Sequence, residues 1–153
     1  MIIIARVICL SITVVLPASC DSDGIHAPPR GLPHAVATRT CAPNDGPAVA
    51  IYLTTTAVQT LEPSAPYLRT AVWQPLDGLR GRSWSLASGS TEGAAWFHST
   101  AMTFEIAIRG NVTVTSVSAD NRVEGTMDVT FPRSGRIRGG FKATWVAQTM
   151  LCG

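Results

Sequence analysis

Charged residues are scarce in this sequence, and lysine is nearly absent. Lys142 is the only lysine, and charged residues make up 14% of the 153-residue chain, whereas soluble domains usually carry about a quarter. The formal net charge is +2, so the chain lacks the basic excess that is typical of nucleic-acid-binding proteins. Apolar residues make up 46%, which excludes the low-hydrophobicity composition of disordered chains. The composition predicts one folded domain and no nucleic-acid partner.

Motifs for catalysis and for metal binding are also missing. The sequence contains no nucleophile elbow, no phosphate-binding glycine loop and no zinc-ligand spacing. His26 and His34 lie in a Pro- and Gly-rich stretch without a partner acid, and a metal site needs more ligands than these two. We therefore expect no metal or other cofactor.

The sequence has no apolar run long enough to cross a membrane as a helix. Only 13 residues separate Arg6 from Cys20, too few to span a hydrocarbon core of about 30 Å. The basic Arg6, the apolar run 7–16 and the small pair Ala18-Ser19 follow the order of a secretory signal peptide. The N-terminus therefore predicts export.

The residues Leu16-Pro17-Ala18-Ser19-Cys20 resemble the lipobox of bacterial lipoproteins, although Pro17 stands where that motif usually has Leu. In that family the Cys becomes the mature N-terminus and carries a diacylglyceryl group. The resemblance implies that residues 1–19 are removed and that Cys20 is the lipid attachment site, which anchors the chain in a membrane of the bacterial cell envelope. Two acyl chains hold a protein stably on a membrane. The alternative is an ordinary secretory signal in which the Cys is coincidental.

Four cysteines are present, and two remain once the N-terminus is processed. Cys9 lies in the signal segment and Cys20 is taken by the lipid, which leaves Cys41 and Cys152. An exported protein folds in an oxidising compartment, so we predict a Cys41–Cys152 disulfide. Two free thiols or a metal-binding pair are the alternatives, and neither has supporting ligands nearby in the sequence.

Residues 20–46 are rich in Pro, Gly and Asp without periodicity, which predicts a lipidated N-terminus followed by a tether. A single β domain is predicted over residues 47–153. Period-two alternation of apolar and polar residues indicates strands. It is clearest over 48–54, 104–108, 112–115, 123–131 and 137–145, with weaker candidates at 67–73 and 83–86.

The last four of the clear strands are joined by short turns, which predicts an antiparallel four-strand meander with one apolar and one polar face. On that pattern Phe104, Ile106 and Ile108 face the core, while Glu105 and Glu124 face solvent. The predicted fold class is all-β, either a small antiparallel barrel or a sandwich.

Three residues are the candidates for a ligand-binding site. Trp84 and Trp96 lie beside Ser- and Gly-rich segments, and His98 is the only histidine of the predicted domain. Aromatic side chains line ligand pockets in barrel mouths, although packing in the core is the commoner use of tryptophan. Arg133, Arg136, Arg138 and Lys142 form the one basic group, which suits either anionic lipid or polysaccharide, or protection of a sheet edge.

These features favour a lipid-anchored module of the cell envelope with a binding or structural role. Its expected partners are the membrane, reached through the lipid, and an envelope protein or a glycan. One alternative is a hydrolase acting on glycan, with Glu105 or Glu124 and His98 as catalytic residues. Another is an inhibitor or chaperone-like lipoprotein that holds a protein partner through a rigid loop within 75–95.

Overall fold

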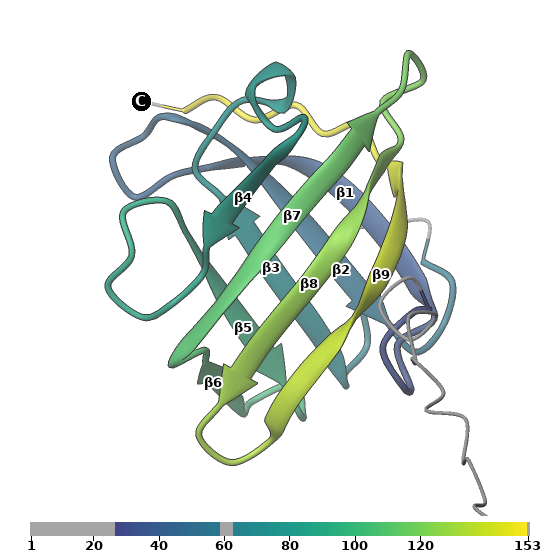
Figure 1. Ribbon diagram of the computed structural model, residues 1–153, viewed down its shortest axis with the longest axis vertical. Coiled ribbons are helices and arrows are strands. Elements are labelled where there is room, and N and C mark those ends of the chain that lie inside the picture. The colour runs from purple at the N-terminus through teal and green to yellow at the C-terminus, as the bar shows by residue number, and fades with distance from the viewer. Residues whose placement is uncertain (1–26, 59–62, 153) are drawn as a thin grey trace, which may run out of the picture.

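The computed structural model describes residues 27–58 and 63–152, so the predicted signal peptide and Cys20 lie outside the described residues. The described chain forms nine strands and one short 3-10 helix, η2 (Leu76–Gly78), which confirms the all-β class (Figure 1). The strands are β1 (His34–Cys41), β2 (Pro47–Thr54), β3 (Tyr67–Val72), β4 (Arg82–Ser85), β5 (Gly93–His98), β6 (Phe104–Ile106), β7 (Arg109–Val117), β8 (Val123–Phe131) and β9 (Gly135–Trp145). Among the described residues, no helix is long and apolar enough to cross a membrane.

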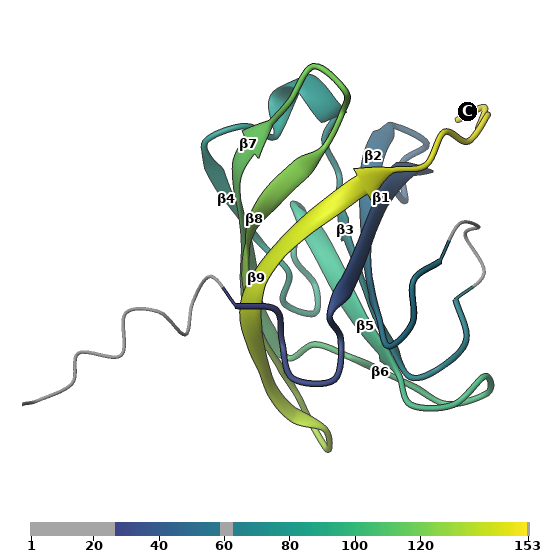
Figure 2. The same ribbon diagram turned by 90° about the vertical axis from the view of Figure 1, so that its right-hand side faces the viewer.

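All nine strands belong to one curled sheet with the order β4-β7-β8-β9-β1-β2-β3-β5-β6. Neighbouring strands are antiparallel except β1 and β9, which are parallel. The sheet curls until its ends approach each other: Ala107 N–H donates to Ala95 O in β5, and the next residue, Ile108, donates to Thr130 O in β8, both at 2.9 Å. The result is a half-barrel with two facing walls (Figure 2).

The C-terminal meander contains three strands, β7, β8 and β9, and not the four that the alternation predicts. The strand that was expected to begin the meander, β6, pairs instead with β5, at the other end of the sheet. The chain passes from β6 to β7 through Ala107 and Ile108. Just after this passage Gly110, the second residue of β7, has φ 152°, and a Cβ there would lie 2.6 Å from the Asp128 carbonyl oxygen, which excludes a side chain at this position.

The two faces of β6 are reversed relative to the prediction. Glu105 is 8% exposed and Ala107 is fully buried. Phe104, Ile106 and Ile108 are instead 52%, 43% and 54% exposed. The buried carboxylate of Glu105 accepts hydrogen bonds from the turn between β8 and β9, and these bonds compensate its loss of water. Hydrogen bonding therefore overrides apolar alternation in this strand.

The predicted tether is wrong for residues 34–41, which form β1. All eight residues of β1 pair with β2, and Val36, Ala37 and Thr38 are buried. The segment before β1 also packs against the sheet: Gly140 N–H donates to Ala27 O at 2.7 Å, and Leu32 is 5% exposed in the core. The domain therefore includes residues on the N-terminal side of Pro47. This strand is not recognisable from alternation in the sequence, because its small residues and Thr make the two faces similar in hydrophobicity.

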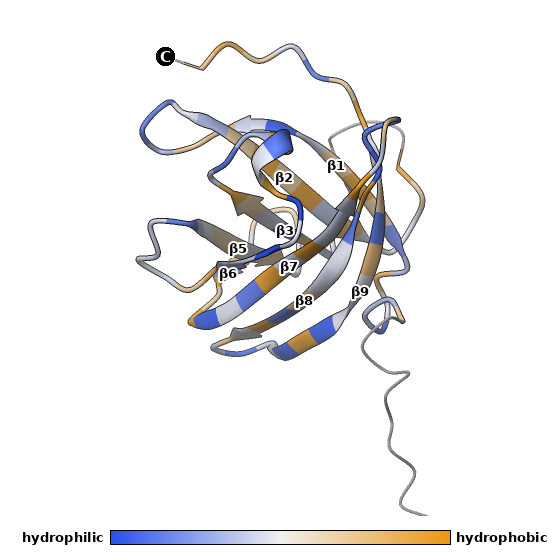
Figure 3. Ribbon diagram, turned by 45° about the horizontal axis from the view of Figure 1, so that its top comes forward, coloured by the Kyte–Doolittle hydropathy of each residue, from blue (hydrophilic) through white to orange (hydrophobic). Residues whose placement is uncertain are grey.

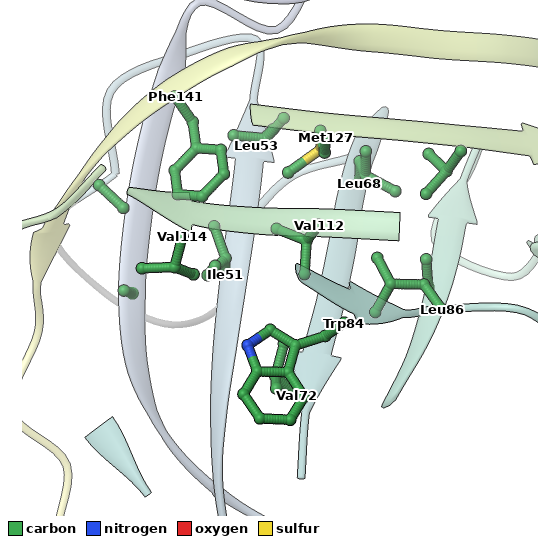
Figure 4. Packing of buried hydrophobic residues seen from close by; sticks show 14 of the residues in the cluster. Ile51, Leu53, Leu68, Val72, Trp84, Leu86, Val112, Val114, Met127 and Phe141 are labelled. Carbon is green, nitrogen blue, oxygen red and sulfur yellow. The ribbon is translucent and has the colours of Figure 1, made fainter. Parts of the chain in front are cut away.

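The core fills the space between the two walls of the half-barrel. Side chains from β2 and β3 point toward those from β7, β8 and β9 (Figure 4). Along β8 the buried and half-buried positions alternate strictly, and Figure 3 shows hydrophobic and hydrophilic residues alternating along this wall. The predicted Cys41–Cys152 disulfide is present, with the two Cα atoms 5.6 Å apart.

Candidate functional site

The three residues that the sequence suggested for ligand binding separate into two environments. Trp84 lies in the core at 7% exposure (Figure 4), and its indole Nε1 is buried without a hydrogen-bond partner. Trp96 and His98 lie on β5 and are half-buried. The structure therefore brings Trp96 and His98 together and assigns Trp84 to packing.

Trp96 and His98 belong to a group of aromatic side chains from four neighbouring strands. One register row joins Tyr52, Arg69, Trp96 and Ile106, and the next joins Thr54, Tyr67, His98 and Phe104. These rows point away from the core, because Leu53 and Leu68, which form a register pair between them, are buried. We call this surface the outer aromatic face; it consists of Tyr52, Tyr67, Arg69, Trp96, His98 and Phe104.

The rings of the outer aromatic face stack on one another. The imidazole of His98 lies 4.3 Å from the Tyr67 ring and 5.5 Å from the Phe104 ring, measured between centroids. The Arg69 guanidinium lies 4.8 Å from the Trp96 ring centroid, a cation–π distance. Partial burial lowers the pKa of His98, and the nearby Arg69 lowers it further. His98 is therefore neutral at neutral pH and acts as one more aromatic ring.

The carboxylates of the hydrolase hypothesis do not form a catalytic pair. The Ser134 hydroxyl donates to Glu105 at 2.7 Å and the Arg133 N–H at 2.8 Å, and these bonds lower the pKa of Glu105. A glycosidase acid needs a raised pKa and a second carboxylate within about 10 Å. Glu124 lies seven residues before Phe131 on β8, about 23 Å along the strand from the end that holds Glu105.

A cavity lies at the mouth of the half-barrel, at the end that carries the C-terminus in Figure 1. Its volume is about 710 Å³, within the range of about 300–1,000 Å³ typical of small-molecule sites. We call it the mouth cavity. Its lining comes from the adjoining ends of β1 and β2 with their turn, the segment at η2, the end of β7 with the turn that follows it, and the C-terminal segment: Arg39, Thr40, Asp45, Pro47, Ala48, Val49, Pro75, Leu76, Asp77, Val117, Asn121, Met150 and Cys152.

The lining of the mouth cavity combines apolar side chains with charges of both signs. Leu76, Val117 and Met150 supply apolar surface, Arg39 supplies one positive group, and Asp45 and Asp77 supply two negative groups. Such a mixture suits an amphipathic small molecule, because apolar contact gives affinity and a few polar groups fix the orientation.

Tight turns place the polar residues at the cavity rim. Asp45 has φ 59° in the turn between β1 and β2, and Asn121 has φ 59° in the turn between β7 and β8. Asp and Asn tolerate this left-handed conformation better than other non-glycine residues. The residues Ala119-Asp120-Asn121 are typical of a turn, so the sequence favours the second of these turns. The sequence gives no sign that Asp45 and Asn121 line the same cavity.

The disulfide forms part of the same wall. Cys152 lines the mouth cavity, and its bond to Cys41 fixes the C-terminal segment beside the end of β1. The crosslink therefore shapes the cavity as well as joining β1 to the C-terminal segment.

No protein-family model matches the sequence, no curated protein matches it, and no solved structure matches the fold. Among the described residues, no group of three or more His, Cys, Asp or Glu side chains is placed to hold a metal ion.

Proposed function

We propose that this protein is an exported, lipid-anchored module of the bacterial cell envelope that binds a small amphipathic molecule in the mouth cavity. The observation that carries the proposal is the cavity itself, which has the volume of a ligand site and is lined from four separate segments. The lipobox-like sequence ending at Cys20 supports the anchor. The disulfide supports export, since such bonds persist in oxidising compartments.

A fluorescent probe tests the binding site. N-phenyl-1-naphthylamine is small, apolar and uncharged, and its emission rises when it leaves water. We expect the protein to enhance this emission, and we expect Val117→Arg to reduce the gain to near background, because a cation then occupies the apolar part of the cavity. Ile108→Arg is the matched control, since Ile108 is 54% exposed outside the cavity. Equal loss in both variants, or no gain with the wild type, contradicts the proposal.

Intact mass spectrometry of protein extracted from membranes tests the anchor. The expected species begins at Cys20 and carries a diacylglyceryl group, and Cys20→Ser releases the protein from the membrane fraction because no acyl chain remains. Unmodified wild-type protein in the soluble fraction contradicts the anchor and leaves the cavity experiment unaffected.

A further inference from the structure

The reversed strand β6 and the residues on either side of it expose a row of large apolar side chains. Met102 is 92% exposed, and the three apolar residues that follow it at every second position are each more than 40% exposed. This row supplies four of the six exposed large hydrophobic side chains of the described residues. We call it the apolar ridge; it consists of Met102, Phe104, Ile106 and Ile108.

Aromatic side chains flank the apolar ridge on one side. Phe104 is in register with His98 and Tyr67, and Ile106 is in register with Trp96. The ridge thus continues directly into the outer aromatic face. Trp and Tyr are enriched where a protein meets the boundary between water and lipid, because their rings are apolar and their edges form hydrogen bonds.

Arginines flank the ridge on the other side. Ile108 is followed by Arg109, whose register partner Thr130 also pairs with Arg136. Arg138 pairs with Asp128 on the same stretch of β8. Arg133 forms an ion pair with Glu105, and Arg136 and Arg138 form ion pairs with Asp128. Glu105 is enclosed by its turn, and Arg133 is 73% exposed, so positive charge dominates the accessible surface at this end of the sheet.

The length of the N-terminal segment allows this end to reach a membrane. Ala27 lies against Gly140, five residues along β9 from Gly135 at the turn, or about 17 Å. Seven residues lead from Cys20 to Ala27, and they span at most about 25 Å. A lipid on Cys20 therefore permits contact between the bilayer and the turn beside β6.

We infer that the apolar ridge and the neighbouring arginines form a membrane-docking surface that rests on anionic lipid headgroups. This inference rests on the proposed lipid anchor, which holds the ridge close to the bilayer. Apolar side chains backed by arginine are the usual composition of a surface that binds at the membrane interface. A second copy is a poorer occupant, because β6 offers only three residues for edge pairing and strands usually need five or six.

Vesicle flotation tests the docking surface independently of the lipid. The mature chain from residue 20 with Cys20→Ser keeps every residue that the structure describes, and it binds only through its own surface. We expect it to float with vesicles of phosphatidylglycerol and phosphatidylcholine, to float less with phosphatidylcholine alone, and to be released by salt. Ile106→Asp lowers the partition coefficient at least about tenfold, because it removes apolar area and adds a charge that anionic lipid repels.

Leu151→Asp is the matched control: Leu151 is 95% exposed on the C-terminal segment at the mouth end, and its replacement leaves flotation unchanged. Both positions are exposed, so thermal unfolding of the two variants should match that of the parent chain. The inference is overturned if the chain does not float, if it floats equally with both vesicle types, or if the two variants lose flotation equally. A concentration-dependent dimer that Ile106→Asp abolishes, without vesicle binding, assigns the ridge to a second copy and also overturns it. The mass of membrane-extracted protein reports on Cys20 separately, so failure of docking and failure of the anchor are distinguishable.

Discussion

Replacing Cys41 and Cys152 together by serine lowers the free energy of unfolding by about 4–5 kcal/mol. The two cysteines are 111 residues apart, so the crosslink restricts almost the whole described chain when it is unfolded. Chain entropy makes this restriction costly for the unfolded state, and the cost grows with loop length. Urea denaturation of the double variant measures the loss. The free energies of unfolding of the oxidised and the reduced wild-type protein should differ by the same amount.

The same variant should lose the mouth cavity before it unfolds. Apart from the disulfide, the C-terminal segment is held at its beginning, where the Val146 N–H donates a hydrogen bond of 2.8 Å to the Ala37 carbonyl oxygen. Met150 then leaves the cavity wall when the crosslink is removed. We expect N-phenyl-1-naphthylamine emission to fall in native buffer, where circular dichroism still reports β structure. An unchanged denaturation midpoint contradicts the stability prediction, and unchanged emission contradicts the role of the disulfide at the cavity.

The sequence predicts those strands whose two faces lie in clearly different environments, one in the core and one toward solvent. Along β8, Val123, Met127, Val129 and Phe131 alternate with polar residues, and each is buried as expected. β9 pairs with β8 over its first nine residues. In such strands apolar burial, β propensity and turn chemistry agree, so local pattern and tertiary structure specify the same register.

Strand β1 and the orientation of strand β6 could not be predicted, for two different physical reasons. In β1 the inward positions are small, and burial comes from pairing with β2 and with β9, where Val36 pairs with the remote Thr144. In β6 the alternation is strong but its meaning is reversed, because Glu105 binds the backbone of a turn 28 residues away. Here the carboxylate is buried and the apolar side chains are exposed, which is the opposite of what residue type favours. Such conflicts between local sequence and structure are expected at functional surfaces.

The candidate sites were only partly visible in the sequence. Trp96 and His98 could be singled out as unusual residues, but their partners Tyr67 and Arg69 become neighbours only through the register of β3 and β5. The mouth cavity was not predicted, since Arg39 lay in the expected tether and Asp77 in a segment without periodicity. The cavity is lined by four segments that are separate in the sequence, so its existence depends on how the chain folds and not on any one segment.

Replacing Phe131 by Ala lowers the free energy of unfolding by about 3–5 kcal/mol, whereas Phe104→Ala costs less than about 1 kcal/mol. Both phenylalanines stand in alternating apolar patterns, so the sequence assigns both to the core. Phe131 is 2% exposed and packs with its ring 5.9 Å from that of Phe97. Its removal leaves a cavity that the surrounding walls fill only in part. Phe104 is 52% exposed and loses mainly its stacking on His98.

Chemical denaturation of the two variants therefore decides the orientation of β6. Equal and large losses would place Phe104 in the core and restore the four-strand meander, which would remove the apolar ridge together with its membrane contact. A large loss for Phe131→Ala alone supports the reversed strand. In that case the exposed apolar area of Phe104 contributes little to folding, and its cost to solubility in water is offset only where another surface, such as the bilayer, covers it.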